Sequence, residues 1–404
     1  MRQRALGLLT RVQPLFRLVR FALPPCLLSL VYLYFYPFFW GCSFPSPQKY
    51  TFTNGPAHRA PFRLLAFGDP QLEGDTSLPT LEVFPLSSLK ELWSTARDGD
   101  TRSLLGFAFT CIQNTLIKDV PRALSSYRKR LDLIGNDYYL AHIYRTLHWY
   151  TKPTHVTVLG DLLGSQWISN KEFGRRNERF WKRVFAGARS VPEETMQGSE
   201  AIEELGENPS WNDRVIAIAG NHDIGYAGDV DEARIERFEK AFGKVNWSIT
   251  FTLPGGLNET ATTETGAATW PSRPALRLIN LNSMNLDTPA LASDLQLSTY
   301  GFMNDMIMSG KPVEDRTHAT ILLTHIPLFK DEGICADGPF FDFFPSWSGV
   351  NVLAGGVKEQ NHLSKDVSVG GILQGIYGLN GDPSVAASGR GRNGIILTGH
   401  DHVG

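Results

Sequence analysis

The chain has 404 residues, of which 42% are apolar and 11% aromatic, and this composition excludes an intrinsically disordered protein. The length allows one large α/β domain or two average ones. The formal net charge is −2, and the first 20 residues contain five arginines and no acidic residue, so the part after residue 20 carries a net charge of −7. A mildly acidic body argues against binding to nucleic acid, which requires a basic stripe.

Residues 21–40 form an uncharged, apolar stretch that is long enough, as a helix, to cross the hydrocarbon layer of a bilayer. We expect a transmembrane anchor here and not a cleaved signal peptide, whose apolar part is shorter and ends at small residues. Pro24 and Pro25 are tolerated near a helix entrance. Because the arginines all precede this stretch, the positive-inside rule predicts that residues 1–20 are a cytosolic tail and that residues 41–404 lie across the membrane.

Two sequons, at Asn246 and Asn258, agree with a secretory-pathway location for the body of the chain. Two of the four cysteines lie in or beside the apolar stretch. Cys111 and Cys335 are therefore the pair that remains for a disulfide within the domain, although sequence alone leaves the pairing open.

After a linker at residues 41–61, which is rich in Pro, Ser and Gly, five short apolar runs each stop at a polar cluster. Such runs fit strands that are buried on both faces. Two stretches, Leu131–Tyr150 and Phe173–Phe185, have helical spacing of apolar residues. Strands alternating with helices predict parallel βαβ units, and hence a layered α/β domain over residues 62–404. The five runs are Arg63–Phe67, His155–Leu159, Val215–Ala219, Ala319–Thr324 and Gly394–Thr398.

The polar clusters that follow these runs contain metal-binding side chains. Open α/β sheets place ligand sites at the carboxyl ends of their strands, and the glycines in the clusters permit tight turns there. Carboxylate, amide and imidazole donors together predict Mn, Fe or Zn, with too much nitrogen for calcium and too little sulfur for a structural zinc. Any one of these motifs alone is more often a turn or a core residue. The candidate ligands are Asp69, Asp161, Asn221, His325, His400 and His402.

In this order, the motifs GDPQ, GDLLGSQW, AGNHDIGY, LLTHIPL and TGHDHVG resemble those of the calcineurin-like metallophosphoesterase superfamily. More closely, NDYYLAHIYRTLHWYTKPTHVTVLGDLLGSQW and NHLSKDVS resemble the fungal enzymes that remove ethanolamine phosphate from glycosylphosphatidylinositol (GPI) anchors in the endoplasmic reticulum. The resemblance covers residues 62–404. It implies a layered fold in which helices flank a central β-sandwich, behind an N-terminal transmembrane helix.

The resemblance also implies a function. The chain would be a metal-dependent phosphodiesterase that removes ethanolamine phosphate from a mannose of GPI anchors and so supports export of GPI-anchored proteins. Its partners would be the GPI substrate and the membrane, with the catalytic domain on the lumenal side of the endoplasmic reticulum or Golgi. The cofactor would be two divalent ions, Mn in first place and Fe or Zn as alternatives, which polarise a phosphoryl oxygen and lower the pKa of a water.

Carried over motif by motif, the resemblance implies that Asp161 bridges the two ions. It assigns His222 to the phosphate and the leaving group, and Asp223 to the orientation of His222. The remaining ligands divide between two sites, the first with Asp69 and His402 and the second with Asn221, His325 and His400.

One position departs from the superfamily pattern, because Gln71 stands where a histidine is usual. An amide binds transition metals less tightly than imidazole, so Gln71 is expected as a weak ligand or as a position open to water. Two alternatives remain at this stage: a hydrolase of another phosphoester, and a non-catalytic membrane receptor or cargo adaptor with the same fold. Since the chain stops two residues after His402, where this fold normally continues, we also expect the domain to be incomplete at its C-terminal end.

Overall fold

The computed structural model describes residues 2–44, 59–74, 87–97, 104–197, 201–253, 273–287, 290–333, 342–345, 354–358 and 362–401. The chain divides into two compact units, one made of residues 1–60 and 139–152 and the other of residues 61–138 and 153–404. His402, Cys335 and Asn258 lie outside the described residues, so the structure does not test the expectations for these three residues.

The first unit contains α1, Arg2–Phe39. Its segment Arg17–Phe39 has a mean hydropathy of 1.7 and is long and apolar enough to cross a membrane, which makes it a candidate span as expected. The helix begins well before residue 21, so Pro24 and Pro25 lie inside it and not at its entrance. Membrane helices tolerate such prolines because neighbouring groups can satisfy the freed backbone carbonyls.

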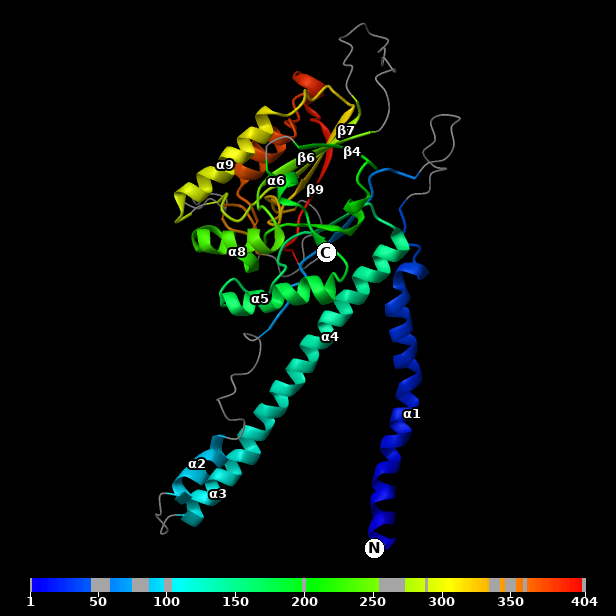
Figure 1. Cartoon of the computed structure of the whole chain (residues 1–404), viewed down its shortest axis with the longest axis vertical. Helices are drawn as coiled ribbons and strands as arrows, with labels where there is room; N and C mark the ends of the chain where they lie inside the picture. Colours follow the sequence, from blue (N-terminus) through cyan, green and yellow to red (C-terminus); the bar gives the residue numbers. More distant parts are fainter. Residues whose placement is uncertain are drawn as a thin grey trace. The chain divides into compact units, whose positions relative to one another are not determined.

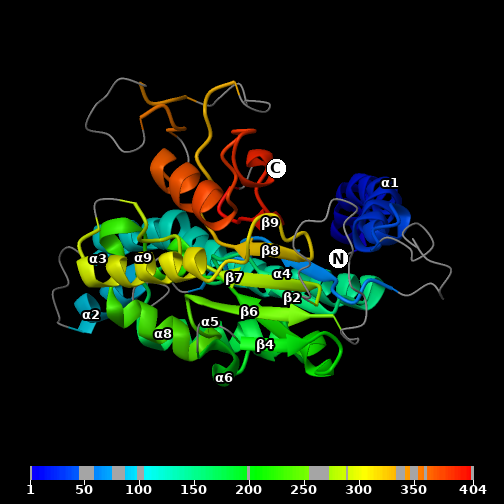
Figure 2. The same ribbon diagram turned by 90° about the horizontal axis from the view of Figure 1, so that it is seen from above.

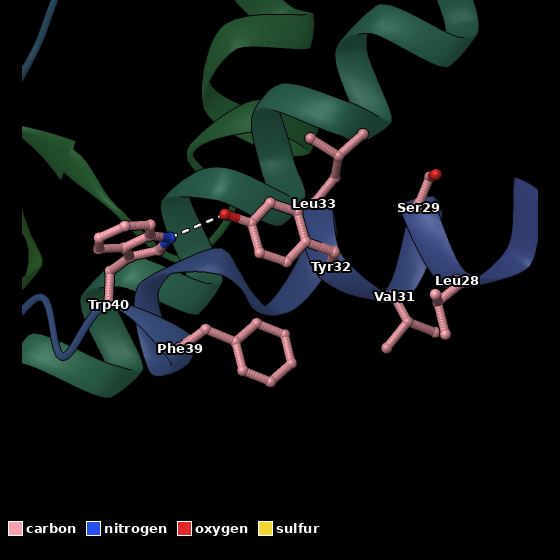
Figure 3. Close-up of a pocket in the computed structure, with 7 residues that line it drawn as sticks. All are labelled: Leu28, Ser29, Val31, Tyr32, Leu33, Phe39 and Trp40. Atoms are coloured by element: carbon pink, nitrogen blue, oxygen red, sulfur yellow. Dashed lines mark hydrogen bonds between the residues drawn. The ribbon is translucent and has the colours of Figure 1, made fainter. Parts of the chain in front are cut away.

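Aromatic side chains gather at the end of α1. Trp40 donates its indole N–H to the Tyr32 hydroxyl at 2.8 Å, and Phe39 stacks on Tyr32 with ring centroids 5.8 Å apart (Figure 3). The hollow in this view is lined by α1 and Trp40 alone, and it is apolar. It belongs to the outward surface of the candidate span and contains none of the predicted metal ligands.

The same end of α1 packs against the last turns of α4, Val120–Thr151. The Tyr34 ring lies 4.1 Å from the His142 ring, and the Phe38 ring lies 4.3 Å from the Tyr150 ring. Residues 139–152 therefore belong to the unit of α1, although we expected them within the catalytic domain.

The second unit contains two β-sheets. The first sheet has the strand order β1-β2-β5-β3, and its strands are parallel. The second has the order β4-β6-β7-β8-β9, in which only the β6–β7 pair is antiparallel (Figure 2). The strands are β1 Leu64–Phe67, β2 His155–Val158, β3 Arg189–Ser190, β4 Ala201–Glu204, β5 Arg214–Ala217, β6 Trp247–Thr252, β7 Ala275–Asn280, β8 His318–Leu323 and β9 Asn393–Leu397.

One hydrophobic core joins the two sheets, because it takes side chains from both. Ile216 of β5, Ile249 of β6, Leu278 of β7 and Leu323 of β8 are all buried members of it. The predicted layered α/β fold with a central sandwich is therefore confirmed. The expectation that all five predicted strands are buried on both faces is wrong for β1, where Ala66 is exposed, and for β9, where Ile395 is 51% exposed. Both are edge strands, each with a partner on one side only among the described residues.

Both predicted helices are present. The first corresponds to α4, which begins earlier than expected, and the second to α5 continued by the π-helical segment η4. The helix α8, Glu232–Phe242, lies beside α5 (Figure 1), and the Phe180 ring of η4 lies 5.1 Å from the Phe242 ring of α8. The longer helical elements are α2 Ser87–Arg97, α3 Leu104–Asn114, η3 Thr115–Asp119, α5 Asn170–Arg179, η4 Phe180–Val184, α8 Glu232–Phe242, α9 Ser293–Met308 and η7 Asp366–Ile376.

Two residues that we considered for modification, Asn246 and Cys111, make contacts or are buried within the folded chain. Asn246 accepts a hydrogen bond from the Asn282 backbone N–H at 2.8 Å and donates its amide to the Thr299 hydroxyl at 3.4 Å. The amide nitrogen that would carry a glycan is thus engaged in the folded chain, which argues against glycosylation at Asn246. Cys111 is buried on α3, and because Cys335 lies outside the described residues, the pairing of the two stays a prediction.

Candidate metal centre

Five predicted ligand motifs follow five strands of the second unit. Asp69 follows β1, Asp161 follows β2, Asn221 follows β5, His325 follows β8 and His400 follows β9. In the first sheet β1, β2 and β5 run parallel to one another, and in the second β8 and β9 run parallel. The carboxyl ends of these strands therefore lie at one edge of each sheet. This placement brings side chains from distant parts of the sequence together.

The loops after β1 and β2 run side by side. The Gln71 backbone N–H donates to the Asp161 carbonyl at 2.8 Å, and the Leu72 N–H donates to the Leu162 carbonyl at 3.1 Å. Arg176 of α5 is fully buried, pairs with Glu172 at 2.9 Å and donates to the Leu72 carbonyl at 3.1 Å. These bonds hold the first two motifs in register.

Asp223 joins the loop after β2 to the loop after β5. Its carboxylate accepts hydrogen bonds from the backbone N–H groups of Leu162, Leu163 and Gly220 at 3.1, 2.9 and 3.0 Å. These three bonds hold the loops together, and the orientation of the His222 ring by Asp223 stays a prediction. Burial and the neighbouring Asp161 raise the pKa of Asp223, and the three N–H bonds oppose this rise.

His325 is fully buried, and its ring orientation is set by the backbone. Its Nδ1 lies 2.7 Å from the Leu159 carbonyl oxygen, so Nδ1 carries the proton and donates it there. In the neutral ring, Nε2 therefore presents a lone pair. That lone pair points at two further acceptors, Asn221 Oδ1 at 3.1 Å and Asp161 Oδ1 at 3.5 Å.

Three converging lone pairs repel one another unless a cation lies between them, so this donor set fits a metal ion. His400 adds a further donor, since its Nδ1 lies 3.0 Å from Asn221 Oδ1. Ligand atoms of Asp161, His325 and His400 lie within 4.8 Å of one another. A backbone carbonyl that orients a ligating histidine is a common support for metal sites in proteins.

Asp69 and His400 bring the first and last motifs together. The Asp69 carboxylate accepts the His400 backbone N–H at 3.0 Å, and its other oxygen lies 3.5 Å from His325 Nδ1. Asp69 therefore reaches the same cluster as Asp161, Asn221, His325 and His400. His402, the expected partner of Asp69 in a second metal site, lies outside the described residues, so the division into two sites stays a prediction.

The turns that carry the ligands are strained. Asp69, Gln71, Asp161 and His400 all have positive φ, at 26°, 40°, 49° and 68°. Such residues cost about 1–3 kcal/mol each and gather at functional sites. Close packing requires glycine beside them: a Cβ on Gly160 would lie 2.2 Å from His325 Nδ1.

His222 and Gln71 both lie against Asp161. The His222 side chain is 38% exposed, and its Nε2 lies 3.8 Å from Asp161 Oδ2, so the ring borders the cluster and also reaches solvent. Gln71 donates its amide N–H to Asp161 Oδ2 at 3.0 Å. In this contact Gln71 acts as a donor to the carboxylate and not as the weak oxygen ligand that we expected.

Burial raises the pKa of Asp161, while the His222 ring, the His222 N–H, Gln71 and His400 lower it. A bound divalent cation would further favour the charged carboxylate. The residue that sequence reasoning missed is Leu159, which acts through its carbonyl oxygen. No sequence signal identifies it, because every residue carries a carbonyl.

Comparison with known proteins agrees with this arrangement. Residues 132–404 match the calcineurin-like phosphoesterase family. Protein TED1 of Saccharomyces cerevisiae is 34% identical over 69% of this chain and 60% of its own length, and an uncharacterised protein of Schizosaccharomyces pombe is 30% identical over 69% of this chain and 57% of its own. Metallophosphoesterase 1 of Pongo abelii is 26% identical over 28% of this chain and 22% of its own length.

The chain thus spans less than two thirds of the length of its two fungal relatives. Both matches are to fungal proteins, which confirms the fungal resemblance of the sequence. Together with the five strand-end motifs and the buried cluster of carboxylate, amide and imidazole groups, the match over most of the second unit shows that the chain belongs to the calcineurin-like phosphoesterase family.

Proposed function

We propose that this chain is a metal-dependent phosphodiesterase that removes ethanolamine phosphate from a mannose of GPI anchors, with its second unit on the lumenal side of the endoplasmic reticulum membrane. The observation that carries the proposal is the convergence of Asp161, Asn221, His325 and His400 on one point with their lone pairs facing inward. The choice of a GPI substrate rests on the resemblance of the motif sequences, and the lumenal side on the arginines before the candidate span.

Asp69, Asp161, Asn221, His325, His400 and His402 would hold two divalent ions, with Mn as the first candidate. When bound, such ions polarise a phosphoryl oxygen and make water a nucleophile at neutral pH. The carboxylate of Asp161 is held for this role by the His222 N–H at 2.9 Å and by Gln71 at 3.0 Å. The orientation of His325 is set before any ion arrives, because the Leu159 carbonyl already holds its Nδ1 proton.

His222 is the group that we assign to the substrate. Its ring is half-exposed at the border of the cluster, 3.8 Å from Asp161 Oδ2, so a substrate can reach it from the solvent side. A protonated His222 would bind the phosphate and give its proton to the mannose oxygen as the P–O bond to mannose breaks and water oxygen bonds to phosphorus. The products are a free mannose hydroxyl and ethanolamine phosphate. One proton of the water stays on the phosphate product, and the other is released and replaces the proton that His222 gave.

The test compares the full chain with its Asp161→Asn variant in detergent. We expect the wild-type chain to contain bound divalent metal and to hydrolyse bis-p-nitrophenyl phosphate faster than the monoester. Asp161→Asn should lower turnover at least about a thousandfold, because the nucleophile depends on the ions that Asp161 holds. Asp132→Asn is the matched control, since Asp132 is an exposed carboxylate that forms an ion pair with Arg128 and is none of the predicted ligands.

GPI bearing ethanolamine phosphate on its mannoses then tests the substrate. An active, metal-loaded chain that releases no ethanolamine phosphate would overturn the GPI proposal and favour another phosphoester. A chain without bound metal and without turnover on any ester would favour the adaptor alternative, for which the donor role of Gln71 is the supporting observation.

A further inference from the structure

The continuous helix formed by α3, η3 and α4 has polar residues on its buried side. Thr115, Asp119, Ser126 and Asp137 are only 7%, 4%, 1% and 2% exposed. Asp119 accepts the Ser88 backbone N–H at 2.9 Å and so caps the start of α2, which lies beside α3 (Figure 1). Polar groups on this side are thus used to attach the helix to the rest of the unit.

Asp137 makes the main attachment. It is paired with Arg179 at 2.7 Å and with Arg183 at 2.8 Å, which lie on α5 and η4. An arginine pair on one buried carboxylate fixes which side of α4 faces the α5–η4 segment. The opposite side must therefore face away from it.

That opposite side is apolar. Phe109, Leu116, Leu124 and Leu131 are 70%, 63%, 64% and 70% exposed. On α4 the exposed apolar residues recur at intervals of three and four, which places them on one face of the helix: they are Leu124, Tyr127, Leu131, Ile134 and Tyr138. We call the exposed apolar residues from Phe109 to Tyr138 the α3–α4 face.

An amphipathic helix of a soluble domain buries mainly apolar residues, whereas the buried side of this helix holds these four polar groups together with Cys111 and Leu133. The exposed fractions show that the described residues leave most of the α3–α4 face open, although the Arg130 guanidinium lies 5.9 Å from the Tyr127 ring centroid and the Arg183 guanidinium of η4 lies 5.4 Å from the Tyr138 ring centroid. Exposed apolar surface on this scale marks an interaction site, since water disfavours it.

The location of α4 favours a lipid surface as the occupant. Immediately after Tyr138, the last turns of α4 pack against the end of the candidate membrane span, where Phe38 meets Tyr150 and Tyr34 meets His142. The helix that carries the α3–α4 face thus continues directly into residues that contact the anchor. Tyr127 and Tyr138 add the amphipathic rings that are enriched at the boundary between headgroups and hydrocarbon.

The charges along the helix agree with this occupant. Lys118, Arg122 and Arg130 are exposed, whereas Asp119 and Asp137 are buried. The remaining acid of this stretch, Asp132, forms an ion pair with Arg128. Exposed basic residues beside an apolar face are features of helices that lie in the headgroup region of membranes.

We propose that the α3–α4 face lies in the headgroup region of the membrane that α1 anchors, with its apolar side chains against the acyl chains. The second unit would then have two attachments to the bilayer, a span and an interfacial helix. This proposal does not depend on the hydrolysis proposed above, and it adds a membrane-binding surface to the domain that carries the candidate metal centre.

Photo-crosslinking of the full chain tests the proposal. The chain is placed in vesicles of phosphatidylcholine with a minority of phosphatidylserine and a fluorescent phospholipid, with p-benzoylphenylalanine in place of either Leu131 or Leu297. Leu297 on α9 is the matched control, because it is 67% exposed against 70% for Leu131. We expect the lipid adduct at position 131 to exceed that at position 297 at least about tenfold. Equal adducts at both positions, or an adduct of position 131 with a second copy of this chain, would overturn the proposal.

A second arm tests the apolar contact itself. With p-benzoylphenylalanine in place of Ile134, the double variant Leu124→Glu and Leu131→Glu should lower the lipid adduct at least about tenfold. The reason is that two leucines that the acyl chains would bury are replaced by charged residues. Leu297→Glu should leave it unchanged. An unchanged adduct in the folded double variant would also refute the membrane contact. Both readouts are independent of catalysis, so an inactive chain bears on the proposed function and not on this inference.

Discussion

Gly160→Ala is expected to weaken metal binding although no metal ligand is changed. Gly160 has φ of +100°, and a Cβ on it would lie 2.2 Å from His325 Nδ1 and 2.7 Å from His325 Cγ. The ring is fully buried, so it has no space to retreat. The methyl group must therefore push the imidazole away from the Leu159 carbonyl that orients it, or distort the turn that carries Asp161.

Two costs contribute to the loss of stability. Alanine at this positive φ costs about 1–3 kcal/mol through backbone strain alone. The clash with the buried ring adds about 1–3 kcal/mol, the usual cost of an extra methyl group in a close-packed interior. Loss of the orienting bond to Leu159 should lower the metal affinity by about 10- to 100-fold, which is the usual effect of removing the support of a ligating histidine.

Gly187→Ala separates the two costs. Gly187 has a similar φ of +95°, but a Cβ on it would have no heavy atom within 4 Å. Urea unfolding of both variants in mild detergent should show the backbone cost in each and the additional cost only in Gly160→Ala. Metal content after dialysis against a weak chelator should fall only in Gly160→Ala. If the two variants retain equal metal, the clash with His325 does not matter and our account of the site is wrong.

Two further outcomes follow from buried charges. Burial between aromatic rings, with Arg63 as a second cause, lowers the pKa of His155 from 6.5 to about 3. Its folded pKa lies below its unfolded pKa, so the stability that the neutral ring contributes is complete above pH 6.5 and is lost as the pH falls towards 3. Between pH 7 and pH 5 this loss amounts to about 2 kcal/mol of the free energy of unfolding. Urea titrations should show it in the wild type and not in His155→Phe. An equal dependence of the unfolding free energy on pH in both proteins would contradict the assignment. Asp137→Ala should lower the free energy of unfolding by about 3–5 kcal/mol in the same assay, because it leaves two arginines without their carboxylate. Asp132→Ala, at an exposed ion pair, should change it by less than about 1 kcal/mol. Similar losses in both variants would show that the Asp137 pairs do not attach α4.

The α4 helix shows where pattern and structure diverge. Apolar spacing predicted a helix from residue 131 to residue 150, and the structure confirms it, but α4 buries Leu133, Ala141 and Tyr144 while other apolar residues of the helix are exposed. Asp137 is buried with them because it pairs with Arg179 and Arg183. Those arginines are distant in sequence, and spacing within α4 contains no information about them.

The sequence by itself determined the chemistry of the centre and the places where its ligands occur. Residue identity sets which donors are available, and short apolar runs set where strands end, so Asp161 and His325 were identifiable without coordinates. Only the tertiary structure decided which atoms meet. The Leu159 carbonyl orients His325, Gln71 donates to Asp161, and the Asp223 carboxylate accepts from three backbone N–H groups. These contacts depend on backbone groups, which every sequence has, and on the paths of the loops. They are defined only when the two sheets pack and bring their strand ends together.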